Sequence, residues 1–139
     1  MGRILGIDYG TVRLGIALSD PLKMFASPQD YLDAKNRKKL LSELKDLCEA
    51  KDVEGIVLGL PMHMSGEEGE SAEAARKLGT AIEEELGYKV TYWDERMSTM
   101  AADRALADLN IKAKDRKDKV DSTAAALILQ GFLDSETYF

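Results

Sequence analysis

Three acidic residues, Asp8, Glu95 and Asp121, stand where a carboxylate is unexpected. Asp8 closes the apolar run ILGID, and Glu95 closes the strand-like run KVTYWDE. Asp121 is followed four and seven residues later by Ala125 and Ile128, so it lies on the apolar stripe of a predicted helix. All three side chains are therefore expected to face the interior of the protein rather than the solvent.

A divalent cation would explain this placement. An ionised carboxylate is costly to bury unless an opposite charge compensates it, and the chain has no basic residue from 120 to 134. Mg²⁺ and Mn²⁺ prefer hard oxygen ligands, and two such ions about 3.5–4 Å apart can activate water and stabilise the leaving oxygen in phosphodiester hydrolysis. Asp8, Glu95 and Asp121 are thus the predicted metal ligands and catalytic residues.

Simpler interpretations remain open for each acid. A strand-end acid often caps a turn, and an acid that opens a helix, as Asp121 is predicted to do, is favoured by the helix dipole. Zinc is a poorer candidate, because the chain has a single histidine, His63, and a single cysteine, Cys48. We expect His63 to be a loop residue that at most assists a proton transfer, and Cys48 to be an apolar filler in a helix.

Two arginines lie close in sequence to the predicted metal ligands. Arg13 follows the turn after Asp8, and Arg96 adjoins Glu95. A guanidinium beside a metal-carboxylate site suits a phosphate oxygen, which it can bind in bidentate geometry. The alternative for both arginines is a structural salt bridge, so their role in nucleic-acid binding is a prediction.

Basic residues also gather late in a chain whose net charge is −6. Between positions 96 and 119, seven basic residues stand against four acidic ones. The run IKAKDRKDK contains Lys114, Arg116 and Lys117 and has too few apolar residues to form a core. It is predicted to be a loop that is either solvated or in contact with phosphates.

The elements that must position these residues follow from periodicity and turn residues. Strands are predicted at 3–8, 13–19, 24–32, 55–61 and 88–95, and helices at 36–52, 72–87, 98–109 and 120–134. Ser71 is a candidate helix cap. Strands and helices alternate from residue 35 onward, which predicts an α/β domain with a mixed sheet and with its chemistry at the C-terminal ends of the central strands.

The composition favours one compact globular protein. The chain of 139 residues is 45% hydrophobic, which is enough for a single domain over 1–139. No stretch approaches the roughly 18 apolar residues of a membrane span, and the N-terminus lacks the pattern of a signal peptide. We therefore expect a cytoplasmic protein with no membrane partner.

Four motifs, IDYGTVRLGIALSD, IVLGLPMHMSGEEG, WDERMSTMAADRAL and KVDSTAAALILQGFL, resemble those of a known family. From residue 2 to residue 133 the chain is similar to the YqgF/RuvX family of the ribonuclease H-like superfamily, relatives of the Holliday junction resolvase RuvC. The resemblance implies a five-stranded mixed β-sheet flanked by α-helices. It also implies a nuclease that processes the 5′ end of pre-16S ribosomal RNA, with its acidic site at Asp8, Glu95 and Asp121.

The same residues leave other functions open. A junction resolvase would use this chemistry on branched DNA and act as a dimer, whereas an assembly module would bind RNA or ribosomal precursor particles without cleaving them. A strand that ends in Asp ahead of Gly-Thr also resembles the phosphate loop of the actin, Hsp70 and sugar-kinase ATPases, but those proteins need two such domains and this chain has room for one. The expected partner is a nucleic acid, either precursor rRNA or branched DNA, bound by a monomer or a weak homodimer.

Overall fold

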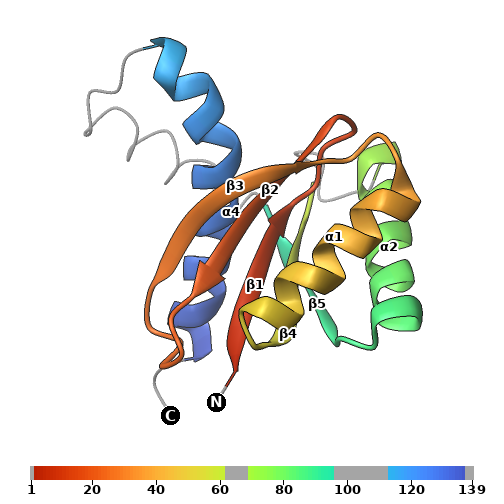
Figure 1. The fold of residues 1–139 in the computed structure, drawn as a ribbon. Coiled ribbons are helices and arrows are strands. Elements are labelled where there is room, and N and C mark those ends of the chain that lie inside the picture. The colour runs from red at the N-terminus through yellow and green to blue at the C-terminus, as the bar shows by residue number, and fades with distance from the viewer. Residues whose placement is uncertain (1, 62–68, 96–112, 137–139) are drawn as a thin grey trace.

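The computed structural model describes residues 2–61, 69–95 and 113–136, with the side chains of 124–135 in the last segment. Within these residues a five-stranded sheet has the order β3-β2-β1-β4-β5 (Figure 1). Its strands are β1 (Arg3–Asp8), β2 (Arg13–Ser19), β3 (Ala26–Asp33), β4 (Val53–Leu60) and β5 (Val90–Asp94). The first three strands pair antiparallel, while β4 pairs parallel with β1 and with β5. The predicted mixed sheet is confirmed, with each strand end within two residues of its expected position.

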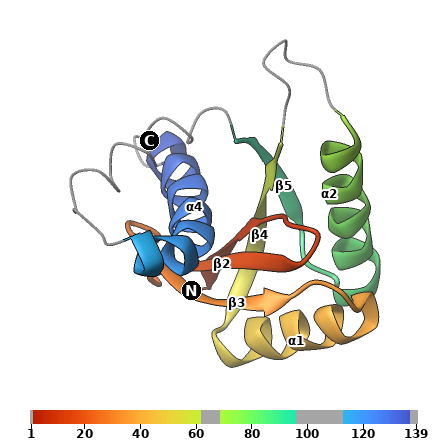
Figure 2. The ribbon, with the colours of Figure 1, turned by 90° about the horizontal axis from the view of Figure 1, so that it is seen from above.

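Helices cover both faces of the sheet. On one face lie α1 (Arg37–Ala50) and α2 (Glu70–Ala81), the latter continued by the π-helical turn η1 (Ile82–Leu86), and on the other lies α4 (Ala113–Glu136) (Figure 2). The side-chain oxygen of Asn36 accepts a hydrogen bond from the Lys39 backbone N–H and so caps the start of α1. None of the helices in the described part of the chain has both the length and the apolar character that a membrane span requires.

Each face of the sheet has its own core, because successive strand residues point to opposite faces. The core beneath α1 and α2 includes the fully buried residues Leu5, Ile7, Leu14, Ile16 and Leu58. The core beneath α4 is smaller and includes Ala17, Val57, Ala125, Ile128, Leu129 and Leu133. The even-numbered residues of β1, which end with Asp8, therefore face α4.

The last helix approaches β1 closely. A Cβ atom on Gly6 would lie 2.7 Å from the Cβ of Leu129 and 3.1 Å from the carbonyl oxygen of Ala125. Any side chain at position 6 would therefore push α4 away from the sheet. The sequence places glycine where the helix backbone crosses the strand.

The prediction for the start of the last helix is wrong. α4 begins at Ala113, so Lys114, Arg116 and Lys117 lie in a helix rather than in a loop, and Asp121 lies beyond the first turn. The segment from 113 to 120 contains neither Gly nor Pro, and five of its eight residues are Ala, Lys or Arg, which favour helix even where no apolar face marks it. Periodicity alone missed it, because the first two turns carry few apolar residues.

The start of α2 also differs from expectation. Ser71 lies inside the helix, and Gly69 holds the N-cap position without a side-chain hydrogen bond. Two acids in the first turn, Glu70 and Glu73, complement the positive end of the helix dipole instead. The helix predicted at 98–109 lies outside the described residues.

Candidate active site

Asp8 and Glu95 lie at the same end of the sheet and on the face covered by α4. Asp8 is the last residue of β1 and is in register with Gly59 of β4. Glu95 directly follows β5, and its backbone N–H donates to the carbonyl oxygen of Leu60 at 3.1 Å. Because side chains alternate along β5, Glu95 shares a face with Trp93, which packs against the core beneath α4. The two acids therefore flank a single strand, β4.

The absence of a side chain at Gly59 makes room for Glu95. A Cβ atom on Gly59 would lie 3.2 Å from Cγ of Glu95 and 2.6 Å from Cδ1 of Ile128. The Glu95 side chain thus leans over β4, toward the strand that ends in Asp8. Adjacent strands lie about 4.7–4.9 Å apart, so the ends of β1 and β5 are two such spacings apart, with Gly59 of β4 between Asp8 and Glu95.

The position of the third predicted acid, Asp121, is set by α4. Position 121 lies one turn before Ala125, whose carbonyl packs against Gly6 of β1. Because α4 runs antiparallel to β1 (Figure 1), the turn that carries position 121 lies toward the Asp8 end of the strand. The Asp121 side chain is not among those described, and the described residues contain no group of three or more His, Cys, Asp or Glu side chains suited to a metal.

The donors that the structure does place fit a hard divalent cation. Asp8 and Glu95 offer carboxylate oxygens, the ligands that Mg²⁺ and Mn²⁺ prefer. Both residues are partly exposed, so water and substrate phosphates can reach the same ion. A site of one or two carboxylates completed by water and phosphate is the usual arrangement for Mg²⁺.

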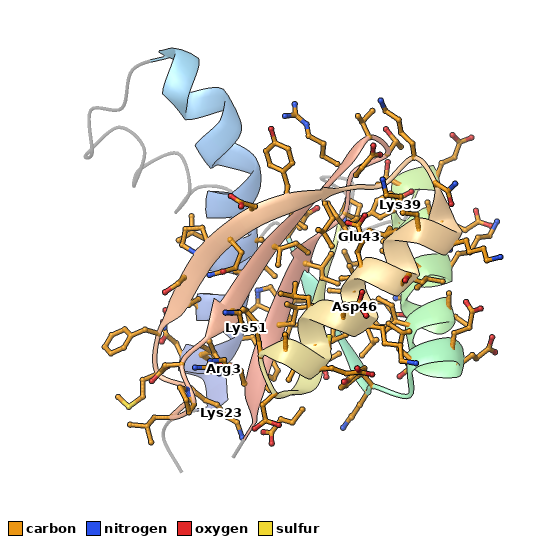
Figure 3. The ribbon with its side chains drawn as sticks, viewed as in Figure 1. Arg3, Lys23, Lys39, Glu43, Asp46 and Lys51 are labelled. Carbon is orange, nitrogen blue, oxygen red and sulfur yellow. The ribbon has the colours of Figure 1, made fainter. Side chains whose placement is uncertain are left out.

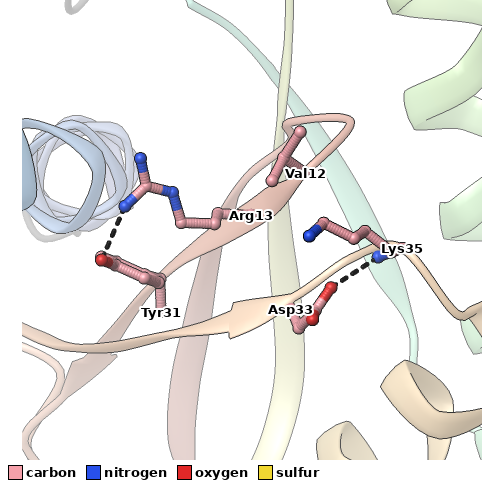
Figure 4. Close-up of a pocket in the computed structure, with 5 residues that line it drawn as sticks. All are labelled: Val12, Arg13, Tyr31, Asp33 and Lys35. Atoms are coloured by element: carbon pink, nitrogen blue, oxygen red, sulfur yellow. Dashed lines mark hydrogen bonds between the residues drawn. The ribbon is translucent and has the colours of Figure 1, made fainter.

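Arg13 lies at the start of β2, on the same face as Asp8. Its Nη1 donates a hydrogen bond to the Tyr31 hydroxyl at 2.6 Å, and its guanidinium carbon lies 4.6 Å from the centroid of the Tyr31 ring (Figure 4). The tyrosine thus holds the arginine from the neighbouring strand. Arg96 and His63 lie outside the described residues, as do the side chains of Lys114, Arg116 and Lys117.

A second basic run was missed by the sequence reasoning. Lys35, Arg37, Lys38 and Lys39 occupy four of the five positions from 35 to 39, with no acid among them. This run joins the end of β3 to the first turn of α1, at the Asp8 end of the sheet (Figure 1). A count of charges in short windows reveals this run, whereas apolar periodicity shows only that a helix begins there.

Cys48 is confirmed as a core residue. Its side chain is fully buried, and this burial raises the pKa of the thiol to about 11. The thiol is therefore protonated near neutral pH, which makes it a poor nucleophile and a poor metal ligand. Cys48 also lies on α1, on the opposite face of the sheet from Asp8.

Comparison with protein families and curated proteins gives a match over nearly the whole chain. The model of the RuvX family, described as Holliday junction resolvase, matches residues 2–135. A protein of Clostridium botulinum (strain Alaska E43 / Type E3) is 42% identical over 132 residues, which cover 95% of this chain and 96% of the relative. A protein of Syntrophomonas wolfei is 43% identical over 132 residues, which cover 95% of this chain and 94% of the relative. Both relatives bear the name "Putative pre-16S rRNA nuclease".

Solved structures with similar folds include two resolvases. RuvC of Thermus thermophilus in complex with a Holliday junction gives a TM-score of 0.63 at 15% identity, over 99% of this chain and 98% of RuvC. The fowlpox virus resolvase bound to junction DNA gives 0.53 at 11% identity, over 97% of this chain and 99% of the resolvase. At these identities the likeness concerns the fold, and it confirms the predicted ribonuclease H-like architecture. Taken with the family match over residues 2–135, this shows that the chain belongs to the RuvX family.

Proposed function

We propose that this protein is a metal-dependent nuclease that hydrolyses phosphodiester bonds, with Asp8, Glu95 and Asp121 as metal ligands and catalytic residues. The observation that supports the proposal is that Asp8 and Glu95 flank Gly59 at one end of the sheet in a member of the RuvX family. A pure binding protein gains nothing from carboxylates that face a phosphate backbone. A nuclease needs them, because they hold the cations that lower the barrier to hydrolysis.

The acids and the arginines of the proposed site have separate roles. Asp8 and Glu95 would hold Mg²⁺ or Mn²⁺, with Asp121 as a further ligand, and the bound ions supply an activated water and neutralise charge on the leaving oxygen. The end of β1 fixes Asp8, and the hydrogen bond from the Glu95 backbone to β4 fixes Glu95. Arg13 would bind a non-bridging phosphate oxygen, and we assign the same role to Arg96.

The proposed substrate is precursor 16S rRNA, because relatives more than 40% identical bear the name "Putative pre-16S rRNA nuclease", and the family resemblance implies cleavage at its 5′ end. The protein would then act in the cytoplasm during ribosome biogenesis, on RNA or ribosomal precursor particles, as a monomer or a weak homodimer and as one domain over 1–139. The description of the family model favours a second candidate, a Holliday junction. A catalytically idle RNA-binding module would cleave neither substrate.

Cleavage assays separate these functions. The purified protein is incubated with labelled precursor RNA and with a synthetic four-way DNA junction, each in Mg²⁺ and in Mn²⁺. We expect cleavage of the RNA. If only the junction is cut, and symmetrically, the proposed function becomes resolution of DNA junctions. An absence of cleavage under all four conditions would contradict the nuclease proposal.

Changing Lys114, Arg116 and Lys117 together to Ala is expected to weaken nucleic-acid binding and to flatten its salt dependence. These three residues lie in the first two turns of α4. Each lost phosphate contact should reduce the slope of log K against log salt concentration by up to about one, while alanine preserves the helix. Affinity is measured at several salt concentrations, and an unchanged slope would mean that this part of α4 is only solvated.

The Asp121→Asn variant is expected to melt higher than the parent protein in metal-free buffer near neutral pH. If Asp121 converges on Asp8 and Glu95, removing one of three like charges relieves repulsion worth roughly 1 kcal/mol, or a few degrees in melting temperature. Added Mg²⁺ should stabilise the parent more than the variant, since a ligand of the folded state adds stability by mass action.

Thermal melts of both proteins, with and without Mg²⁺, check this expectation. The alternative in which the helix dipole favours Asp121 loses its basis, because α4 begins eight residues earlier and the dipole acts mainly on the first turn. A metal-free variant that melts lower than the parent, together with equal metal shifts in both proteins, would remove Asp121 from the site.

A further inference from the structure

A hollow of about 340 Å³ opens beside the candidate active site, between the turn that joins β1 to β2 and the end of β3 (Figure 4). Five residues line it: Val12, Arg13, Tyr31, Asp33 and Lys35. Its volume is at the small end of the range of ligand sites, about 300–1,000 Å³, so it suits part of a ligand, such as one unit of a polymer. A polymer unit bound in the hollow would contact the side chain of Val12, which is 51% exposed.

A β-bulge builds one wall of the hollow. Leu14 pairs with Leu32 and Ile16 pairs with Gln29, so two residues of β3 oppose the single Gly15 of β2. The extra residue reverses the alternation of side chains along β3. Asp33 is opposite Arg13, so alternation along β3 puts Tyr31 on the same face as Arg13. The bulge lets Ala26, five residues before Tyr31, face α4 as well.

Backbone hydrogen bonds fix the rest of the hollow. The Ala34 N–H donates to the Val12 carbonyl oxygen at 2.8 Å and ties the end of β3 to the turn between β1 and β2. The Lys35 N–H donates to Oδ1 of Asp33, also at 2.8 Å. Together with the bond between Arg13 and Tyr31, these contacts hold the lining in place without a ligand.

The charges of the lining favour an anion. Arg13 and Lys35 are two cations against one carboxylate, Asp33, in a chain whose net charge is −6. The basic run from 35 to 39 continues from the rim of the hollow into α1 and adds three further cations. A positively charged hollow on an acidic protein concentrates anionic ligands locally.

The hollow is also adjacent to Asp8. In the antiparallel pair of β1 and β2, Asp8 is opposite Gly15, and Arg13 is the next residue of β2 on the same face. Such diagonal neighbours lie about 7–8 Å apart, which is close to the spacing of successive phosphates along a nucleic-acid strand. A strand whose phosphate is bound at Asp8 and Glu95 can therefore place its neighbouring nucleotide in the hollow.

From this geometry we infer that the hollow is a subsite for a nucleotide that flanks the cleaved bond, with Arg13 and Lys35 on its phosphate and Tyr31 as the positioning residue that orients Arg13. This inference rests on the proposed nuclease function for the identity of the strand. The negative charge of Asp33 repels the phosphate and so lowers the affinity of the hollow for RNA. The basic run from 35 to 39 guides the strand away over the start of α1.

Binding of a single-stranded RNA of about 12 nucleotides tests the subsite. It is measured at several salt concentrations in excess chelator, so that the result does not depend on cleavage. Lys35→Gln should weaken binding about two- to fivefold, as for an exposed charge pair, and lower the salt slope by about 0.7. Asp33→Asn should strengthen binding by a similar factor, because the amide oxygen still accepts from the Lys35 N–H while the negative charge is gone.

The Tyr31→Phe variant tests whether Tyr31 orients Arg13, because it changes no charge. It keeps the ring beneath the guanidinium but removes the hydroxyl that accepts from Arg13, so the affinity should fall while the salt slope stays the same. The matched control is Lys51→Gln, the same change of charge at the other end of α1, far from Lys39 and the start of the helix (Figure 3). This control should leave the affinity and the slope unchanged, and thermal melts of every variant verify folding.

The outcomes distinguish the subsite from the nuclease. If the parent protein cleaves RNA but Lys35→Gln and Asp33→Asn leave binding unchanged, the subsite is wrong and the nuclease stands. If the two variants shift binding in opposite directions but no substrate is cleaved, the nuclease is wrong and the hollow stands only as an RNA-binding site. If Lys35→Gln and Lys51→Gln have equal effects on RNA binding, a general charge effect explains the data and the subsite is wrong. If the variants change the binding of inorganic phosphate in the same way as that of RNA, the hollow is a simple anion site and the subsite is again wrong.

Discussion

Replacing Asp8 by Asn or Glu95 by Gln is expected to lower the rate of phosphodiester cleavage at least about a hundredfold. A bound divalent ion contributes several kcal/mol of transition-state stabilisation, and each 1.4 kcal/mol corresponds to about a tenfold change in rate. Both substitutions keep the size of the side chain and remove the charge that holds the cation. Rates are measured on the substrate that the parent protein cleaves, with Mg²⁺ or Mn²⁺ and at matched protein concentration.

Two controls keep this result specific to the site. Both residues are partly exposed at the ends of strands, so the variants should fold, and this is checked by circular dichroism and thermal melting. Asp46→Asn, on the exposed side of α1 (Figure 3), removes the same charge away from the site and should leave the rate unchanged. Cleavage by the parent protein that persists in excess chelator would contradict the metal mechanism.

Gly59→Ala is expected to lower both the stability of the fold and the rate of cleavage. The new methyl group would lie 2.6 Å from Cδ1 of Ile128 and 3.2 Å from Cγ of Glu95, so α4 or Glu95 must move. Overpacking of this kind costs about 1–3 kcal/mol, which lowers the melting temperature by several degrees. Since a displacement of about 1 Å can cost a hundredfold in rate, cleavage should fall more than stability alone predicts.

Gly55→Ala is the matched control, on the same strand and the same face. A Cβ atom there meets only Cδ1 of Ile4, at 3.5 Å, which is ordinary van der Waals contact. Alanine also restricts the unfolded chain more than glycine, so this variant should be as stable as the parent or slightly more stable. If Gly59→Ala behaves like Gly55→Ala in melting and in cleavage, the close packing of Glu95 over β4 is not what positions this acid.

Much of the fold could be predicted from local patterns. Short apolar or β-type runs bounded by turn residues located all five strands. The spacing of Leu40, Leu44 and Cys48 located α1, because a buried helix face repeats with the period of the helix. The first two turns of α4 were missed for the same reason. They carry charge and little apolar surface, so helix propensity rather than burial decides their structure.

The candidate acids were also found in the sequence, because an acid at the end of an apolar run is visible without a structure. The sequence could not show that Glu95 and Asp8 flank Gly59, since the two acids are far apart in the chain and come together only through the parallel pairing of β4 with β1 and β5. Strand order is set by long-range packing and not by any local signal.

The strands, the helix faces and the candidate acids can be predicted from the sequence, because each depends on residues within a few positions of one another. Which of these residues meet depends on how the sheet and the helices pack. The clearest case is the register between β2 and β3: Asp33 opposes Arg13, which brings Tyr31 beside Arg13, and a bulge opposite Gly15 lets Ala26 share that face. A bulge depends on the register between two strands, and register is a property of the assembled sheet, so no pattern within β3 alone could reveal it.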